Sequence, residues 1–199
     1  RYLGFSMKIW PKWLIRITSE PESDASKHWS VAQGAILILL CDQFTKYLIQ
    51  HFLPCDPSVF CRNSFPAEGV FRLTHIHNSG SIFGLFYGFN TPLIFISFLG
   101  ILILTFIYLS QRVRNKWLRL SIALQIGGAL GNVADRIRVG YVIDFIDVGI
   151  SAWRWPAFNI ADASIISGLC ILVVIIMSSD GSIIERRSNG LADVIDSED

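Results

Sequence analysis

Four long runs of apolar residues divide the chain, and polar or charged stretches separate them. The runs cover residues 31–49, 91–109, 118–133 and 159–177. An α-helix needs roughly 17–25 apolar residues to cross a bilayer, so each run is near that length, although glycines weaken the third. Residues 101–109 and 171–177 are apolar on every side of a helix, which favours lipid surroundings over a soluble bundle. The pattern predicts an all-α membrane protein with four transmembrane helices.

Two segments between these runs have the composition of β-strands, and they predict a small extracytoplasmic β-element. Residues 69–77 and 139–145 are rich in β-branched and aromatic side chains. His75 and His77 alternate onto one face of the first strand, but no Cys or Glu cluster stands at ligand spacing, so we predict no metal site. The segment NSGSIFG (78–84) follows, and its glycines permit either a tight turn close to a ligand or an ordinary turn.

Basic residues predict the orientation of the chain in the membrane. They gather in the arm 1–30 and in the link between the second and third runs, at Arg112, Arg114, Lys116 and Arg119. Lys and Arg concentrate on the cytoplasmic side of membrane proteins. We therefore expect a cytoplasmic N-terminal arm (1–30), a four-span domain (31–177) and a cytoplasmic C-terminal tail (178–199). The two other loops face outward.

Composition narrows the function classes. The 199 residues are 52% hydrophobic and carry a net charge of +1, so nothing indicates a nucleic-acid partner. Indole rings favour the membrane–water interface, which predicts that Trp153 and Trp155 lie at headgroup level. Cys55 and Cys61 share an outer loop, where an oxidising compartment would permit a disulfide. Two free thiols are the alternative.

Charged and amide side chains lie inside or beside the apolar runs, and the predicted topology brings them to one depth. These residues are Asp42, Asn78, Asn132, Asp135, Asp144, Asn159 and Asp162. Polar groups at membrane depth are costly, so they mark a functional site.

Spacing within this set predicts which side chains meet. Asp42 and Lys46 are four residues apart on a helix, so their charges pair on one face. The pattern Asn-x-x-Asp occurs twice, at residues 132–135 and 159–162. Arg136 stands beside Asp135, where a purely structural ion pair is the alternative to a site role. Glycines at 127, 128 and 131 let helix backbones approach closely.

Two carboxylates held close together can hydrolyse an amide bond. Because both cannot readily ionise at short range, the pair shares one proton. The ionised member accepts a proton from water while the protonated member donates to the carbonyl oxygen. An ion-coupled transporter also uses acidic residues within spans. The sequence shows no inverted repeat for such a transporter, so an aspartic hydrolase is the better interpretation.

Five sequence blocks, in order, resemble the lipoprotein signal peptidases, also called signal peptidase II. They are DQFTK (42–46), NSGSIFG (78–84), GGALGNVADR (127–136), GYVIDFID (140–147) and FNIAD (158–162). The resemblance implies a multi-pass aspartic endopeptidase of the bacterial cytoplasmic (inner) membrane, with its active site at the outer face. It implies diacylglyceryl-modified prolipoproteins as substrates, cut just before the lipidated cysteine.

The resemblance also implies the site residues. Asp144 and Asp162 match the family's catalytic aspartates, while the symmetry of the two Asn-x-x-Asp motifs makes Asp135 the rival of Asp144. Supporting or substrate-binding positions are Asp42, Lys46, Asn78, Gly80, Asn132, Asp135, Arg136 and Asn159. Asp147 receives no role. We expect no cofactor and no metal, contact with membrane lipid, and a monomer.

Overall fold

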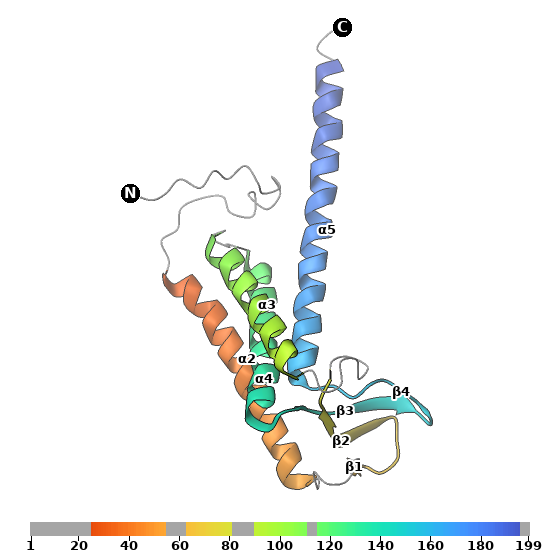
Figure 1. The fold of residues 1–199 in the computed structure, drawn as a ribbon. Helices are drawn as coiled ribbons and strands as arrows, with labels where there is room; N and C mark the ends of the chain where they lie inside the picture. Colours follow the sequence, from red (N-terminus) through yellow and green to blue (C-terminus); the bar gives the residue numbers. More distant parts are fainter. Residues whose placement is uncertain (1–24, 55–62, 81–89, 111–114, 196–199) are drawn as a thin grey trace.

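The structure of the chain is a computed structural model that describes residues 25–54, 63–80, 90–110 and 115–195. Within these ranges it contains four helices and one four-stranded antiparallel sheet, which lies at one end of the helices (Figure 1). The helices are α2 (Ala25–Phe52), α3 (Asn90–Ser110), α4 (Lys116–Val139) and α5 (Ile160–Ile195). The strands are β1 (Asn63–Phe65), β2 (Phe71–Asn78), β3 (Val142–Ile150) and β4 (Trp153–Arg154).

Each predicted apolar run lies in a helix, but the helices extend beyond the runs. α2 begins at Ala25 rather than at residue 31, and α5 continues to Ile195 rather than ending near residue 177. Hydropathy marks the part of a helix that can lie in lipid, whereas backbone hydrogen bonding continues into polar residues. The first residues of α2 therefore fall in the predicted arm, and much of the predicted tail is helical.

Helix α4 is central because it packs against α2, α3 and α5. Its glycines permit this close approach, as the sequence predicted. A Cβ atom on Gly127 would stand 2.6 Å from the carbonyl oxygen of Ala35 in α2. One on Gly128 would stand 2.4 Å from the carbonyl oxygen of Ala161 in α5. Real Cβ contacts are not this short, so only glycine allows these backbones to meet.

Replacing Gly128 with alanine is therefore expected to push α4 and α5 apart. The clash is with backbone rather than with a flexible side chain, so the helices must separate. We expect a loss of stability of about 2 kcal/mol, in the range for overpacking of a tight contact, measured as a lower thermal unfolding temperature in detergent. Gly100→Ala in α3 is the matched control, because a Cβ there meets nothing within 4 Å. Equal unfolding temperatures for the two variants would contradict the prediction.

Local sequence fixes both ends of α4. Asn115 caps its first turn, since the Asn115 side chain accepts hydrogen bonds from the backbone N–H groups of Trp117 and Leu118. Gly140 ends the helix in the left-handed conformation, with φ of 84°, which glycine adopts without steric cost. This turn directs the chain from α4 into β3.

The sheet has the strand order β1-β2-β3-β4. The predicted strands correspond to β2 and β3, although β3 continues to Ile150 rather than ending at residue 145. β1 and β4, with 3 and 2 residues, are too short for a pattern of alternating side chains to reveal. The register between β2 and β3 shifts between Leu73 and Ile76. Such an irregularity bends a strand and redirects its side chains.

Apolar side chains cover the outside of the helices, while charged ones lie within. In α3, Phe95, Leu102 and Phe106 are each more than 60% exposed. In α2, Leu40 and Phe44 are exposed, whereas Asp42 and Lys46 are fully buried. Two of the described helical segments, Asn90–Leu109 and Ile160–Ser178, are long and apolar enough to cross a membrane. The result is a helix-rich protein with a small antiparallel sheet and a large exposed apolar surface.

Some sequence predictions concern residues outside the described ranges. Cys55, Cys61 and residues 81–84 of the NSGSIFG segment are among them. The two loop tryptophans are described, and their side chains are exposed: Trp153 is 89% and Trp155 is 63% accessible.

Candidate active site

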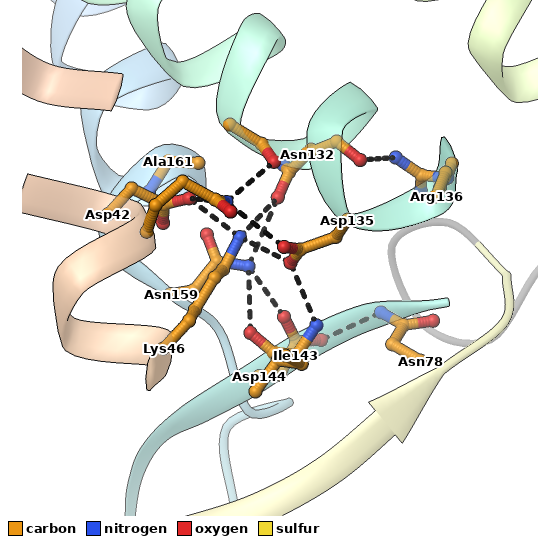
Figure 2. Close-up of polar contacts among 12 residues, drawn as sticks. Asp42, Lys46, Asn78, Asn132, Asp135, Arg136, Ile143, Asp144, Asn159 and Ala161 are labelled. Carbon is orange, nitrogen blue, oxygen red and sulfur yellow. Dashed lines mark hydrogen bonds and ion pairs between the residues drawn. The ribbon is translucent and has the colours of Figure 1, made fainter. Parts of the chain in front are cut away.

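The site lies where α2, α4, β3 and the start of α5 meet (Figure 2). A short β-bridge brings β3 and the start of α5 together. The N–H of Ile146 donates to the carbonyl oxygen of Phe158 at 2.8 Å, and the N–H of Phe158 donates to that of Ile146 at 3.1 Å. This pairing places the residues after Phe158 beside β3. Asp162, in the first turn of α5, is thereby held near Asp144 of β3.

Asn159 and Asp162 form a reciprocal cap at the start of α5. The N–H of Asp162 donates to Asn159 Oδ1 at 2.9 Å, and the N–H of Asn159 donates to Asp162 Oδ2 at 3.2 Å. Two otherwise unpaired N–H groups of the helix terminus are satisfied in this way. The Asn-x-x-Asp motif of residues 159–162 is thus a capping box that also orients a carboxylate.

Two asparagine side chains connect the two carboxylates. Asn159 Nδ2 donates to Asp144 Oδ1 at 2.8 Å and to Asn132 Oδ1 at 3.2 Å. Asn132 Nδ2 in turn donates to Asp162 Oδ1 at 2.8 Å. Asn159 is fully buried and Asn132 is 8% exposed, so little water competes for these bonds. The amides fix both carboxylates in one continuous network.

The end of β2 contacts the other side of Asp144. Asn78 Nδ2 donates to Asp144 Oδ2 at 2.8 Å (Figure 2). The orientation of this amide is set locally, because Asn78 Oδ1 accepts the N–H of Gly80 at 3.0 Å. The carbonyl oxygen of Gly80 accepts from Arg136 Nη2 at 3.1 Å. Asn78, Gly80 and Arg136, all predicted to support the site, therefore surround Asp144 and the turn beside it.

Lys46 stands behind the asparagines and binds three acceptors. Its Nζ lies 2.8 Å from Asp42 Oδ2, 2.8 Å from Asp135 Oδ2 and 3.2 Å from Asn132 Oδ1. Lys46, Asp42 and Asp135 are fully buried. The predicted Asp42–Lys46 pair is confirmed. Together with Asp135 it forms a cluster of three charged groups (Figure 2). An ammonium group has three N–H donors, so this geometry uses all of them.

The predicted pairing of Asp135 with Arg136 is wrong. Asp135 instead pairs with Lys46, lies 3.7 Å from Arg138, and accepts the N–H of Ile143. Arg136 donates to the carbonyl oxygens of Asn132 and Gly80. Adjacent helix residues point in directions about 100° apart, so the carboxylate faces the interior while the guanidinium faces the β2 turn. Asp135 thus ties α4 to α2 and β3.

The electrostatic surroundings of Asp144 raise the pKa of its carboxyl group. Its burial, followed by the negative charge of Asp162, raises its pKa from 3.8 to about 7. Hydrogen bonds from Asn78 and Asn159, together with the charge of Lys46, oppose this rise but do not cancel it. At neutral pH one of the two carboxyl groups can therefore hold a proton while the other is ionised.

Asp147, which had no predicted role, binds two arginines. Asp147 Oδ2 lies 2.7 Å from Arg72 Nη2, and Asp147 Oδ1 lies 2.6 Å from Arg154 Nε. Sequence reasoning also missed Gln43, whose side-chain amide nitrogen, Nε2, donates to Asp135 Oδ1 at 3.0 Å. Its signal was available, since Gln43 is a polar residue beside Asp42 inside an apolar run. For the arginines there was no such signal, because exposed loop cations are common.

The structure offers no metal centre within its described residues, where no group of three or more His, Cys, Asp or Glu side chains is arranged to hold an ion. The rings of His75 and His77 contact each other edge to face, with centroids 4.9 Å apart. His77 also stacks on Tyr141, with a centroid separation of 3.9 Å. These imidazoles take part in ring packing.

Comparisons with known proteins show which family this chain resembles. The family model described as signal peptidase (SPase) II matches residues 34–178. The lipoprotein signal peptidase of Syntrophus aciditrophicus is 40% identical over 147 residues, which cover 69% of this chain and 86% of that protein. The corresponding protein of Moorella thermoacetica is 41% identical over 140 residues, with the same two shares.

Two solved structures are similar to this chain in fold. A bacterial membrane enzyme determined by the in meso method at 2.3 Å resolution superposes with a TM-score of 0.67 at 27% identity, covering 77% of this chain and 90% of that one. A second, at 1.9 Å resolution, gives a TM-score of 0.62 at 28% identity and covers 74% and 92%. The described residues of the five sequence blocks meet around Asp144 and Asp162 within the matched region, and the chain belongs to the signal peptidase II family.

Proposed function

We propose that Asp144 and Asp162 are the catalytic pair with which this signal peptidase removes signal peptides from diacylglyceryl-modified prolipoproteins, cutting just before the lipidated cysteine. The observation that carries the proposal is the pKa of Asp144, which burial and then the negative charge of the nearby Asp162 raise to about 7. A pair poised to share a proton at neutral pH has the property that amide hydrolysis by two aspartates requires.

The raised pKa of Asp144 supports different roles for the two carboxyl groups. Asp144 holds the proton and donates it to the carbonyl oxygen of the scissile amide. Asp162 accepts a proton from a water molecule, whose oxygen attacks the carbonyl carbon. The tetrahedral intermediate then collapses and the C–N bond breaks, while the proton held by Asp162 passes to the leaving nitrogen. One hydroxyl proton of the intermediate returns to Asp144, so the product is a carboxylic acid and the pair is restored. Asn132 and Asn159 keep both carboxylates in place, since each donates directly to one of them.

Asp135 has a different role in this proposal. Its two oxygens are occupied by Lys46, Gln43 and the N–H of Ile143, and the carboxylate is fully buried. A fully buried carboxylate whose oxygens are already hydrogen-bonded is not available to a water molecule or a substrate. Asp135 and Asp42 therefore anchor Lys46, which in turn holds the Asn132 side chain.

The remaining supporting residues are suited to substrate binding. Arg136 and the turn at Gly80 lie beside Asp144, with Arg136 donating to the Gly80 carbonyl oxygen. Arg136 Nε is buried and has no hydrogen-bond partner among the described residues. A buried N–H in this state is unfavourable unless a ligand accepts from it. We assign Asn78, Gly80 and Arg136 to the substrate peptide.

The exposed apolar surface supports four membrane spans, each centred on one of the helices α2 to α5. The charged side chains in the middle of α2 and near the end of α4, Asp42, Lys46 and Asp135, are buried and pair with one another, which allows these less apolar helices to lie in lipid. With the basic arm and the basic α3–α4 link on the cytoplasmic side, the sheet and the site lie at the outer face of the inner membrane. There a monomer meets its lipid-anchored substrates from the outer leaflet.

Cleavage of a lipidated prolipoprotein by the purified chain is expected to slow as the pH rises through about 7. The pKa of Asp144 is raised, so the acid is protonated below that value and loses its transferable proton above it. Initial rates in lipid micelles, measured from about pH 5 to about pH 9, should fall roughly tenfold per pH unit on the alkaline side.

The variant Asn78→Ala tests whether the loss of rate at alkaline pH, the alkaline limb of the profile, comes from Asp144. Asn78 donates to Asp144 and thereby lowers its pKa, so removing the amide should move the alkaline limb to higher pH. An unlipidated precursor serves as the substrate control and should be cleaved poorly, because the acyl chains retain the substrate at the membrane. A flat profile across neutral pH would contradict the assignment of Asp144 as the acid.

A further inference from the structure

A cavity of about 690 Å³ opens on the sheet, apart from Asp144 and Asp162. Its polar lining consists of Ser64, Arg72, Asp147, Ser151 and Arg154, with the ring of Trp155 beside them. Asp144 and Asp162 are not among its lining residues. The cavity is built from β2, β3, β4 and the loop that follows, and the proposed reaction leaves it without a function.

The lining carries a net positive charge. Asp147 is the common partner of Arg72 and Arg154, at 2.7 Å and 2.6 Å. Burial opposes ionisation of Asp147, but hydrogen bonds and charges from Arg154 and Arg72 outweigh it and lower the pKa of this carboxyl. One carboxylate therefore faces two guanidinium groups through the neutral range. Glu68, in the adjoining turn, is not part of the lining.

Arg154 is committed to the protein itself. Its Nε donates to Asp147, and its Nη atoms donate to four carbonyl oxygens, those of Gly69, Val70, Asp147 and Gly149. These bonds fasten the loop before β2 to the β3–β4 hairpin. Its five N–H donors are therefore in use, and its role is to shape the cavity and to contribute charge.

Arg72 has donors left for a ligand. Its Nε and one Nη2 N–H donate to Asp147, and one Nη1 N–H donates to the carbonyl oxygen of Ala67. A guanidinium has five N–H groups, so two remain uncommitted among the described residues. Its side chain is 16% exposed, which leaves the group reachable from the cavity. Paired N–H donors in this arrangement match the oxygens of a phosphate group.

The cavity rim has the character of a membrane interface. Trp155 is 63% exposed, and the neighbouring Trp153 and Ile150 are 89% and 71% exposed. Exposed indoles beside an apolar side chain are typical of protein surface at headgroup depth. A guanidinium beneath such a rim lies at the depth where lipid phosphates are found.

We propose that this cavity binds the phosphodiester of an anionic phospholipid, with Arg72 holding the phosphate and Trp155 contacting the glycerol and upper acyl region. The net positive lining selects a headgroup that carries negative charge overall, because a choline or ethanolamine cation would face two guanidinium groups. Bound lipid fixes the sheet against the membrane surface. The proposal does not depend on the catalytic roles of Asp144 and Asp162.

Binding of a short-chain phosphatidylglycerol to the purified protein tests this site. The probe is dihexanoyl phosphatidylglycerol below its micelle concentration, and the readout is native mass spectrometry with calorimetric titration. We expect saturable binding that weakens roughly tenfold in Arg72→Gln, as loss of a charge-assisted phosphate contact implies. Lys116→Gln is the matched control, because Lys116 is an exposed cation at the opposite end of α4. Its affinity should equal that of the unmodified chain.

Three results would overturn the proposal. They are equal binding of dihexanoyl phosphatidylcholine, equally tight binding of inorganic phosphate, and unchanged affinity in Arg72→Gln. The phosphatidylcholine shows whether the site requires a lipid with negative charge overall. The inorganic phosphate shows whether the phosphate group alone is enough for binding. If Arg72→Gln unfolds, Trp155→Ala decides the matter, since it keeps both ion pairs of Asp147. Weaker lipid binding in that folded variant supports the site, and unchanged binding refutes it.

Discussion

Replacing Asp144 with asparagine is expected to reduce cleavage of a lipidated prolipoprotein by about 10³-fold, within the range for loss of a general acid or base. The amide keeps the size of the carboxyl group and can still bond with Asn78 or Asn159. It cannot transfer a proton to the scissile carbonyl. Replacing Asp162 with asparagine should cause a similar loss, because water then has no carboxylate to accept its proton. Initial rates with one lipidated substrate measure both effects.

Three measurements make this result specific. Asp193→Asn, which lies beyond the family match at residues 34–178, should retain full activity. Thermal unfolding shows whether each inactive variant is folded. Asp135→Asn separates the rival pair, because we expect it to act through stability rather than through the chemical step. The catalytic assignment fails if folded Asp144→Asn or Asp162→Asn cleaves at nearly the original rate, or if folded Asp135→Asn is the inactive variant.

Replacing Lys46 with methionine is expected to destabilise the protein by about 3–5 kcal/mol, the usual effect of removing one partner from a buried ion pair. Methionine fills a similar volume but leaves Asp42 and Asp135, both fully buried, without their shared cation. It also removes one of the two N–H groups that Asn132 Oδ1 accepts, and the other comes from Asn159. The Asn132 amide is then held less firmly against Asp162. Thermal or denaturant unfolding in detergent measures the change.

Two comparisons identify the buried charge as the cause. Lys116→Met removes an exposed lysine from the other end of α4 and should change stability by less than about 0.5 kcal/mol. The double variant Lys46→Met/Asp135→Asn should be more stable than Lys46→Met alone, because it leaves one fewer uncompensated carboxylate in the interior. If the second substitution adds further destabilisation instead, the charge cluster is not what Lys46 stabilises.

Much of this architecture was predictable because its signals are local. An apolar run of about 20 residues can satisfy its backbone in lipid only as a helix, so hydropathy found all four helices. The spacing of Asp42 and Lys46 predicted their ion pair, since residues four apart share a helix face. Glycine at 127 and 128 predicted close helix contacts, and the structure places backbone carbonyls where their side chains would be.

Other features depended on contacts between distant segments. Asp135 and Arg136 are neighbours in sequence, yet they face different parts of the protein and bind different partners. The helix periodicity gave their relative directions but not what lies in each direction. Asp147 had no predicted role because its partners, Arg72 and Arg154, come from separate strands. Strands β1 and β4 were missed because pairing with a neighbour, rather than their own composition, makes them strands.

The two Asn-x-x-Asp motifs show where sequence ends and tertiary structure begins. By itself the sequence determined the helices, the polar residues they carry and, through five matching blocks, the family. On motif symmetry alone it favoured Asp135 over Asp144, because Asp135 and Asp162 stand in matching Asn-x-x-Asp motifs; only the family resemblance favoured Asp144. The fold ranks them by surroundings: Asp135 is bound by a buried ammonium group, whereas Asp144 has no ion-pair partner among the described residues and lies within the field of Asp162. Proton affinity depends on burial and nearby charge, and both are set only when distant segments pack together.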